Sequence, residues 1–131
     1  MALAAKKTEA VLWCGIVLPE HVHLLVSAQR GKSPLDMAAC FKRLTTIAFR
    51  RLGFIEPLWQ RRIHDRGLRA DFNNDIELAV RYLLDNPVRR SLVLSWEDWP
   101  FCHIHQDIAA GTGPAATSAD STSGLKYPVM E

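Results

Sequence analysis

The sequence predicts a single α+β domain in which antiparallel strands carry packed helices. Its 131 residues, 48% of them apolar, suffice for one hydrophobic core. Two apolar runs, 11–18 and 21–27, are separated by Pro19-Glu20, which is typical of a hairpin turn. Two later stretches, 33–52 and 74–86, repeat apolar residues every three to four positions, as amphipathic helices do. Strands followed by helices therefore define the predicted class.

The first predicted helix, 33–52, has recognisable signals at both ends. Ser33 can cap it, Pro34 suits the first helical position, and Asp36 completes a pattern like a capping box. Gly53 is a plausible stop. The buried stripe is expected to consist of Met37, Phe41, Leu44, Ala48 and Leu52.

The second predicted helix, 74–86, begins at Asn74 as its cap, with Glu77 three residues later. Pro87 is expected to end it, because the residue before a proline avoids helical geometry. Its core-facing positions are Ile76, Ala79, Val80 and Leu83. Residues 54–72 between the helices are expected to be irregular, with a short strand near 63–68.

Composition divides the chain into three parts. Residues 1–10 are an N-terminal segment, 11–106 are the folded domain, and 107–131 are a low-complexity tail that is expected to be disordered. No run approaches the ~20 apolar residues of a membrane span, and the first ten residues lack the apolar centre of a signal peptide. Three separated cysteines suggest a reducing compartment, so a bacterial-type cytoplasm is predicted.

Charge is unevenly distributed along the chain. The net charge is +2, yet residues 30–90 hold 13 Lys and Arg against seven acidic residues, a net of +6. A basic middle with paired arginines suits a phosphate backbone. A solvated helix face explains the same composition equally well, so both interpretations stay open.

His21-Val22-His23 lies in the second predicted strand. Residues two apart on a strand share a face, with roots about 6–7 Å apart, so both imidazoles could reach one metal ion. Burying two imidazoles is costly unless something satisfies them. A lone His-X-His is a weak motif, as a second copy shows. His103-Ile104-His105 lacks a long apolar run and is interpreted as surface or packing histidines.

Tyr82 and Asn86 are four apart and therefore lie on one flank of the second helix. A phenol is a weak nucleophile that needs activation, or a metal that makes the phosphate a better electrophile. Taken alone, Tyr82 is more typical of helix packing, and Asn86 of a helix end before Pro87.

Four blocks, in order and at familiar spacing, point to a known family. They are Leu-Pro-Glu-His-Val-His at 18–23, Leu-Trp-Gln-Arg-Arg at 58–62, Tyr-Leu-Leu-Asp-Asn-Pro-Val-Arg at 82–89, and Asp-Trp-Pro-Phe at 98–101. Over about residues 11–106 the chain resembles single-tyrosine HUH transposases, especially the REP-associated tyrosine transposases of bacteria. The resemblance implies a protein that cuts and rejoins single-stranded DNA at hairpin-forming repeat ends through a 5′-phosphotyrosine intermediate.

The same resemblance implies roles for individual residues. Tyr82 would be the nucleophile, and His21, His23 and Asn86 would hold Mg²⁺ or Mn²⁺, which an amide oxygen and imidazoles suit. The candidates for holding the DNA strand are Arg43, Arg61, Arg62 and Arg89. The implied fold is a ferredoxin-like antiparallel sheet with helices on one face.

The chain departs from the family pattern before the histidine pair. Twenty residues precede His21, too few for the family's first strand and helix, so an incomplete ferredoxin-like sheet is expected. The absent strand would leave an edge of the histidine strand unpaired. Either the chain is a truncated remnant, or it repairs the sheet by pairing with a second copy as a homodimer.

Three functions therefore stay open. The first is a strand-transferring transposase, and the second is an inactive DNA-binding remnant of one. The third is a small metal-binding or dimerisation module that uses His21 and His23, with Cys102 or His103 as a further ligand.

Overall fold

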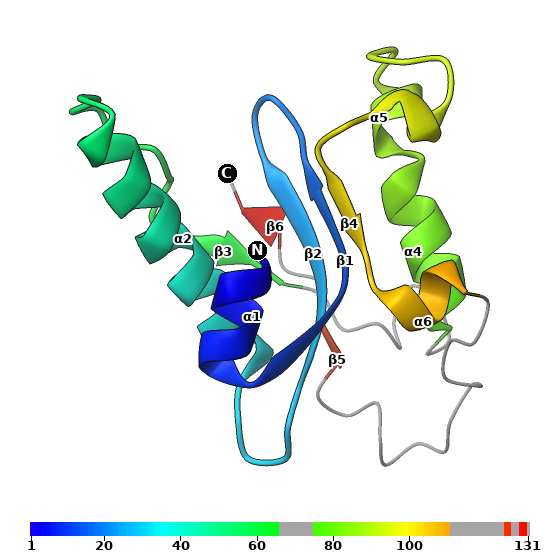
Figure 1. Cartoon of the computed structure of the whole chain (residues 1–131), viewed down its shortest axis with the longest axis horizontal. Helices are drawn as coiled ribbons and strands as arrows, with labels where there is room; N and C mark the ends of the chain where they lie inside the picture. The colour runs from blue at the N-terminus through cyan, green and yellow to red at the C-terminus, as the bar shows by residue number, and fades with distance from the viewer. Residues whose placement is uncertain (66–74, 111–124, 127–128, 131) are drawn as a thin grey trace.

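An antiparallel sheet forms the centre of the molecule, and helices cover both of its faces (Figure 1). The computed structural model describes residues 1–65, 75–110, 125–126 and 129–130. The central strands are β1 (Ala10–Val17), β2 (Val22–Ala28) and β4 (Cys102–Ile104), in the order β2-β1-β4. The predicted α+β class with an antiparallel sheet is thus confirmed. The ferredoxin-like topology stays a prediction.

The predicted hairpin is confirmed as β1 and β2. Its tight turn is closed by the backbone N–H of Leu18, which donates to the carbonyl of His21 at 2.8 Å. The antiparallel register places Val17 opposite Val22 and Ile16 opposite His23. On its other side β1 pairs with β4, so the hairpin strand β1 is central in the sheet.

The outer edge of β2 is covered by short strands of the same chain. β6 (Val129–Met130) pairs with Val22 and His23, and β5 (Leu125–Lys126) pairs with residues further along β2. β3 (Ile63–His64) pairs in turn with β6. The edge that was expected to be unpaired therefore has partners near the C-terminus. Most of the segment 107–131, which was predicted to be a disordered tail, lies outside the described residues; α6 (Gln106–Ala109) begins just before this segment, and β5 and β6 lie in it.

Side-chain alternation in the sheet builds two separate cores. On one face, Cys14, Ile16 and Leu25 pack against the apolar stripe of α4 (Ile76–Leu84). On the other face, Leu12, Leu24 and Val26 pack against α1 (Ala2–Thr8) and α2 (Pro34–Arg51). Helices on one face, which the resemblance implied, are therefore a wrong prediction for this chain, because both faces of β1 and β2 are apolar and each needs a cover.

Helix α2 follows its predicted boundaries but buries only its first half. The Ser33 hydroxyl accepts from the backbone N–H of Leu35, and Gly53 ends the helix with a φ of +90°. Met37 and Phe41 are buried, whereas Ala48 is exposed and Leu52 is 75% exposed. The predicted stripe is wrong for these last two positions, because the end of α2 extends past the sheet (Figure 1).

Helix α4 is capped one residue later than predicted. The carboxylate of Asp75 accepts from the backbone N–H of Leu78 at 3.0 Å, and the predicted cap Asn74 lies outside the described residues. Pro87 does not follow the helix directly, since α4 ends at Leu84 and Pro87 opens the one-turn helix α5 (Asn86–Arg89). Within the part of the chain that the structure describes, no helix is both long and apolar enough to cross a membrane.

The second half of the chain returns to the sheet through an aromatic connector. A 3₁₀ turn, η1 (Trp96–Asp98), precedes Trp99, whose indole N–H donates to the carbonyl of Val17 at 2.9 Å. The Trp99 ring also packs edge-on against Phe101 and joins the core beneath α4. This connector fixes β4 beside β1 and closes the edge of that core.

Shortening Leu83 to alanine is expected to lower the free energy of unfolding by about 2–5 kcal/mol. Leu83 is 1% exposed and lies in the core that joins α4 to the sheet, so alanine loses contacts and leaves a cavity. Urea unfolding measures the change. Leu94→Ala is the matched control, because Leu94 is 98% exposed and its truncation should change stability by less than about 0.5 kcal/mol. Equal losses for both variants would contradict this core assignment.

Candidate functional site

The two histidines of the first block lie against each other at the turn end of the hairpin. His21 belongs to the turn and is 8% exposed, and His23 is the second residue of β2. Their Nε2 atoms are 2.9 Å apart, and their rings meet edge to face with centroids separated by 4.6 Å. The structure therefore brings together the two imidazoles that the sequence placed on one face.

Burial keeps His23 neutral. Desolvation, followed by the charges of His21, Arg90 and Arg89, lowers the pKa of His23 to about 4. Neutral imidazole is the form that binds metal ions, so His23 is in the metal-binding form at neutral pH. The Nδ1 atom of His23 is buried without a hydrogen-bond partner among the described residues. An unsatisfied buried polar atom of this kind costs stability and is more typical of functional sites than of structural cores.

Acidification is expected to destabilise the metal-free protein between about pH 6.5 and pH 4. The unfolded chain protonates His23 near its ordinary pKa of 6.5, whereas the folded chain resists until about 4, so unfolding takes up a proton in this window. Neutral His23 therefore contributes about 1–3 kcal/mol to the free energy of unfolding above pH 6.5, and this contribution is lost as the pH falls. Thermal unfolding in chelator at several pH values measures it. His23→Leu should flatten the profile, and an unchanged profile would contradict the assignment.

The histidine pair has suitable dimensions for one cation. Two metal–nitrogen bonds of about 2.1 Å at a right angle would place the nitrogens about 3.0 Å apart, close to the 2.9 Å observed. Among the described residues no three His, Cys, Asp or Glu side chains form a cluster. Within the described part of the chain, a third protein ligand would therefore be of another type, such as an amide oxygen.

Tyr82, Asn86 and Arg89 form a second group at the junction of α4 and α5. Tyr82 is 46% exposed in the last turn of α4, and the guanidinium carbon of Arg89 lies 4.0 Å from the centre of its ring. An Arg89 nitrogen also donates to the backbone carbonyl of Tyr82 at 3.0 Å, and its Nε lies 3.5 Å from the carboxylate of Asp85. Arg89 therefore contacts Tyr82 in two places, the face of its ring and its backbone carbonyl.

Asn86 is oriented by the same helix end. Its Nδ2 donates to the carbonyls of Leu83 at 3.0 Å and Tyr82 at 3.3 Å. The amide nitrogen is thereby used within the helix, so the amide oxygen is the atom that Asn86 has for another partner. The amide oxygen of Asn86 is therefore a candidate for the third protein ligand of a cation held by the two histidines.

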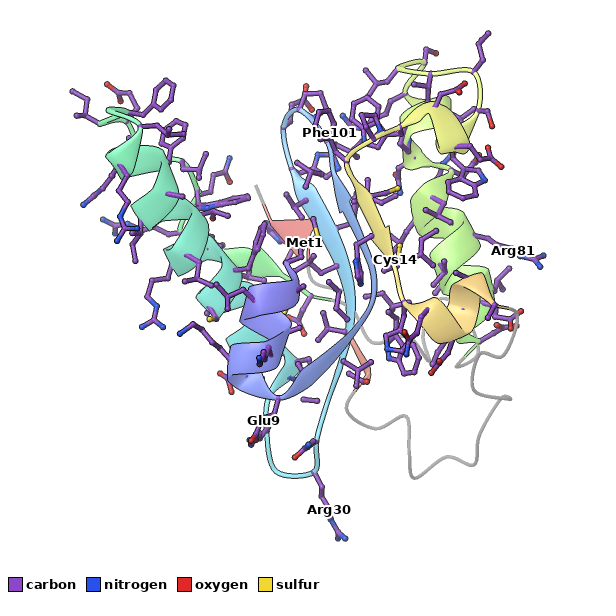
Figure 2. The ribbon with its side chains drawn as sticks, in the orientation of Figure 1. Met1, Glu9, Cys14, Arg30, Arg81 and Phe101 are labelled. Atoms are coloured by element: carbon purple, nitrogen blue, oxygen red, sulfur yellow. The ribbon has the colours of Figure 1, made fainter. Side chains whose placement is uncertain are left out.

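An ion pair connects the two groups. Arg90, which follows α5, lies with Nη1 3.0 Å from the Oε2 of Glu20, the residue before His21. The charges of Arg89 and Arg90 both act on His23. Figure 1 shows α5 and the β1–β2 turn at the same end of the molecule. The residue preceding the tyrosine, Arg81, points away from the sheet in Figure 2.

A cavity of about 630 Å³ lies beside His21. The turn contributes Glu20, the irregular segment after α2 contributes residues 57–61, and Arg90 completes the wall. The sequence did not single out Glu20 or Arg90 as site residues. In the sequence, these two residues could be noticed only because they are next to His21 and Arg89. Their ion pair joins positions 70 residues apart, so no local sequence pattern indicates it.

The four predicted DNA-contacting arginines are distributed unequally. Arg61 lines the cavity beside His21, and Arg89 lies on the Tyr82 ring. Arg62 is exposed and follows Arg61, and its backbone carbonyl accepts from Lys42 at 3.4 Å. Arg43 lines a different cavity, between α1 and α2, together with Lys7 and Asp36. The structure thus brings two of the four to the candidate site.

The second His-X-His copy has a structural role, as predicted. The Nδ1 of His105 accepts from the backbone N–H of Asp107, and its ring packs on Trp13 with centroids 4.9 Å apart. Cys102 and His23 both lie opposite Ile16 on different sides of β1, so their backbones are about 10 Å apart. This separation argues against a metal module that joins Cys102 to the histidine pair.

The chain is similar in sequence to two curated proteins. One, from Escherichia coli K12, is named REP-associated tyrosine transposase and is 29% identical over 107 residues, which cover 82% of this chain. The second, from Haemophilus influenzae, carries the same name provisionally and is 26% identical over 117 residues, covering 81% of this chain. The chain is similar to REP-associated tyrosine transposases. The resemblance predicted from the four blocks is therefore confirmed.

The similarity to REP-associated tyrosine transposases covers part of their length. The matched segments span 62% of the E. coli relative and 64% of the H. influenzae relative. No protein-family model matches the chain, and no solved structure matches it significantly. A transposase-like function is thus supported by the two relatives, whereas the mechanism has to be argued from the site.

Proposed function

We propose that this chain is a transposase-like protein that cleaves and rejoins single-stranded DNA at hairpin ends, with Tyr82 as the nucleophile. One observation carries the proposal: the Arg90–Glu20 ion pair ties the end of α5, the short helix that follows the tyrosine helix, to the turn that holds the histidine pair. This ion pair supports a site that combines the phenol of Tyr82, the imidazoles of His21 and His23 and the amide of Asn86. The DNA processed would lie in the cytoplasm.

The covalent step transfers a phosphoryl group from the strand to the protein. The phenolic oxygen of Tyr82 attacks a backbone phosphorus, the bond to the 3′ oxygen breaks, and the chain retains a 5′-phosphotyrosine. The phenolic proton passes to a base or to water, and the released 3′ oxygen takes up a proton. Attack on the phosphotyrosine by a 3′-hydroxyl reverses these changes and rejoins the strand.

The surrounding residues favour this step in distinct ways. Arg89 fixes the phenol ring through its face and its backbone carbonyl, which limits the orientations the nucleophile samples. His21, His23 and Asn86 would hold a divalent cation such as Mg²⁺ or Mn²⁺, which when bound polarises a phosphate oxygen and offsets developing negative charge. Arg61 and Arg89 would attract and position the phosphate backbone.

A covalent-capture assay tests the proposed function. Purified protein is incubated with a labelled hairpin that has single-stranded flanks, in Mn²⁺, in Mg²⁺ and in chelator, and is analysed on a denaturing gel. We expect an adduct that requires metal and a single-stranded flank. Binding of the hairpin without an adduct in either metal would replace the proposal by a DNA-binding protein without turnover. Absence of both would overturn it.

A further inference from the structure

We propose that the cavity beside His21 is a subsite for one unpaired nucleotide of the strand, adjacent to the phosphate that is cleaved. The inference rests on the proposed function and extends it to the part of the substrate that the chain recognises. The cavity measures about 630 Å³, within the range of about 300–1,000 Å³ that is usual for small-ligand sites. His21 is both a wall of this cavity and a member of the histidine pair. A nucleotide in the cavity would therefore place its flanking phosphate beside the imidazoles.

The segment that forms one wall is held firmly on α2. The indole N–H of Trp59 donates to the hydroxyl of Thr45 at 2.9 Å, and the ring packs on Phe41 with centroids 5.8 Å apart. Lys42 donates to the backbone carbonyls of Gln60 and Arg62. Trp59 is thus used for packing. Because the backbone of this segment is held by α2, the side chains of Gln60 and Arg61 are the groups in this wall that can contact a ligand.

The charges around the cavity suit a phosphodiester. Arg61 and Arg90 supply two guanidinium groups, and Arg61 makes no ion pair within the described residues. Arg90 is paired with Glu20 through Nη1, and its other guanidinium N–H groups can donate to a phosphate while this ion pair stays in place. Guanidinium groups bind phosphate oxygens through paired hydrogen bonds.

The remaining wall residues suit a base. Gln60 offers an amide with both a donor and an acceptor, the combination that reads the edge of an unpaired base. Pro57 and Leu58 supply an apolar surface for its face. The amide suits the edge of the base, the apolar residues suit its face, and the guanidinium groups suit the phosphate. A fully apolar ligand or a simple anion would use only some of these wall residues.

An abasic scan of the bound strand tests the subsite. In the Tyr82→Phe protein, which should bind without cleaving, single nucleotides of the flank are replaced one at a time by abasic residues and affinities are measured. We expect one position, next to the cleaved phosphate, where loss of the base weakens binding about tenfold. Gln60→Ala should weaken binding of the intact strand and reduce the extra loss at that position, leaving the part that comes from the apolar contacts of Pro57 and Leu58. Arg61→Gln should weaken all strands equally, because it contacts phosphate.

The controls separate this inference from the proposed function. Arg81→Gln removes an arginine that points away from the sheet and should leave affinity unchanged within twofold (Figure 2). A free mononucleotide should fail to compete at concentrations that saturate a short strand; effective competition would assign the cavity to free nucleotides and overturn the strand subsite. A flat abasic scan, or a base effect of unchanged size in Gln60→Ala, would also overturn it. These binding results are independent of whether the wild-type protein forms a phosphotyrosine.

Discussion

Replacing Tyr82 by phenylalanine is expected to abolish the covalent DNA adduct while leaving the fold and DNA binding intact. The variant removes the attacking oxygen and keeps the ring against the Arg89 guanidinium. The side chain is 46% exposed, so loss of the hydroxyl should change the free energy of unfolding by less than about 0.5 kcal/mol. Loss of a nucleophile lowers turnover by roughly 10³-fold or more. Denaturing gels measure the adduct, and fluorescence anisotropy measures binding.

The chain provides a matched control for this variant. Its sequence contains two tyrosines, so Tyr127→Phe removes the other phenol and should leave the adduct unchanged. Mass spectrometry of the digested adduct should find the nucleotide on the peptide that contains Tyr82. An adduct that survives in Tyr82→Phe, or one that maps to another side chain, would contradict the assignment of the nucleophile.

The second large effect is expected from either histidine of the pair. His21→Gln and His23→Gln each remove one imidazole from a pair whose Nε2 atoms are 2.9 Å apart, so one cation loses a ligand. Changing partners of metal ligands alone costs about 10–100-fold in affinity, and loss of a ligand should cost about 100-fold or more. Titration calorimetry with Mn²⁺ measures the affinity, and the adduct should fall in parallel at limiting metal.

His103→Gln is the matched control for the histidine variants. It changes the same residue type in the second His-X-His copy, which lies in β4 on the other side of β1. Its Mn²⁺ affinity should equal that of the wild type. If the three variants bind Mn²⁺ equally, the cation is held elsewhere and the histidine pair is not a metal site.

Local signals in the sequence predicted the elements that position the site. Two apolar runs on either side of Pro19-Glu20 predicted the hairpin, and the observed register keeps His23 on the face that α4 covers. Ser33 and Gly53 bounded α2, as expected from capping preferences and from the positive φ that glycine tolerates. These features depend on neighbours within a few residues, so one sequence suffices to predict them.

Long-range features were not predictable in the same way. The Glu20–Arg90 ion pair and the pairing of β6 with β2 join residues 70 and more positions apart, and no periodicity records them. The wall of the cavity likewise depends on how the segment after α2 returns to the turn. The exposure of Leu52 follows from the length of α2 relative to the sheet, which its amphipathic pattern does not encode.

The distance between Tyr82 and a cation on the histidine pair tests the central claim most directly. Fluorotyrosine is incorporated into the Tyr127→Phe protein, so Tyr82 gives a single fluorine resonance, and Mn²⁺ is added without DNA. We expect strong paramagnetic broadening of this resonance at stoichiometric Mn²⁺, and we expect no such broadening in a protein that also carries His21→Gln and His23→Gln. A resonance that stays sharp while Mn²⁺ occupies the two histidines would show that the phenol and the cation do not share a site, and would contradict the account.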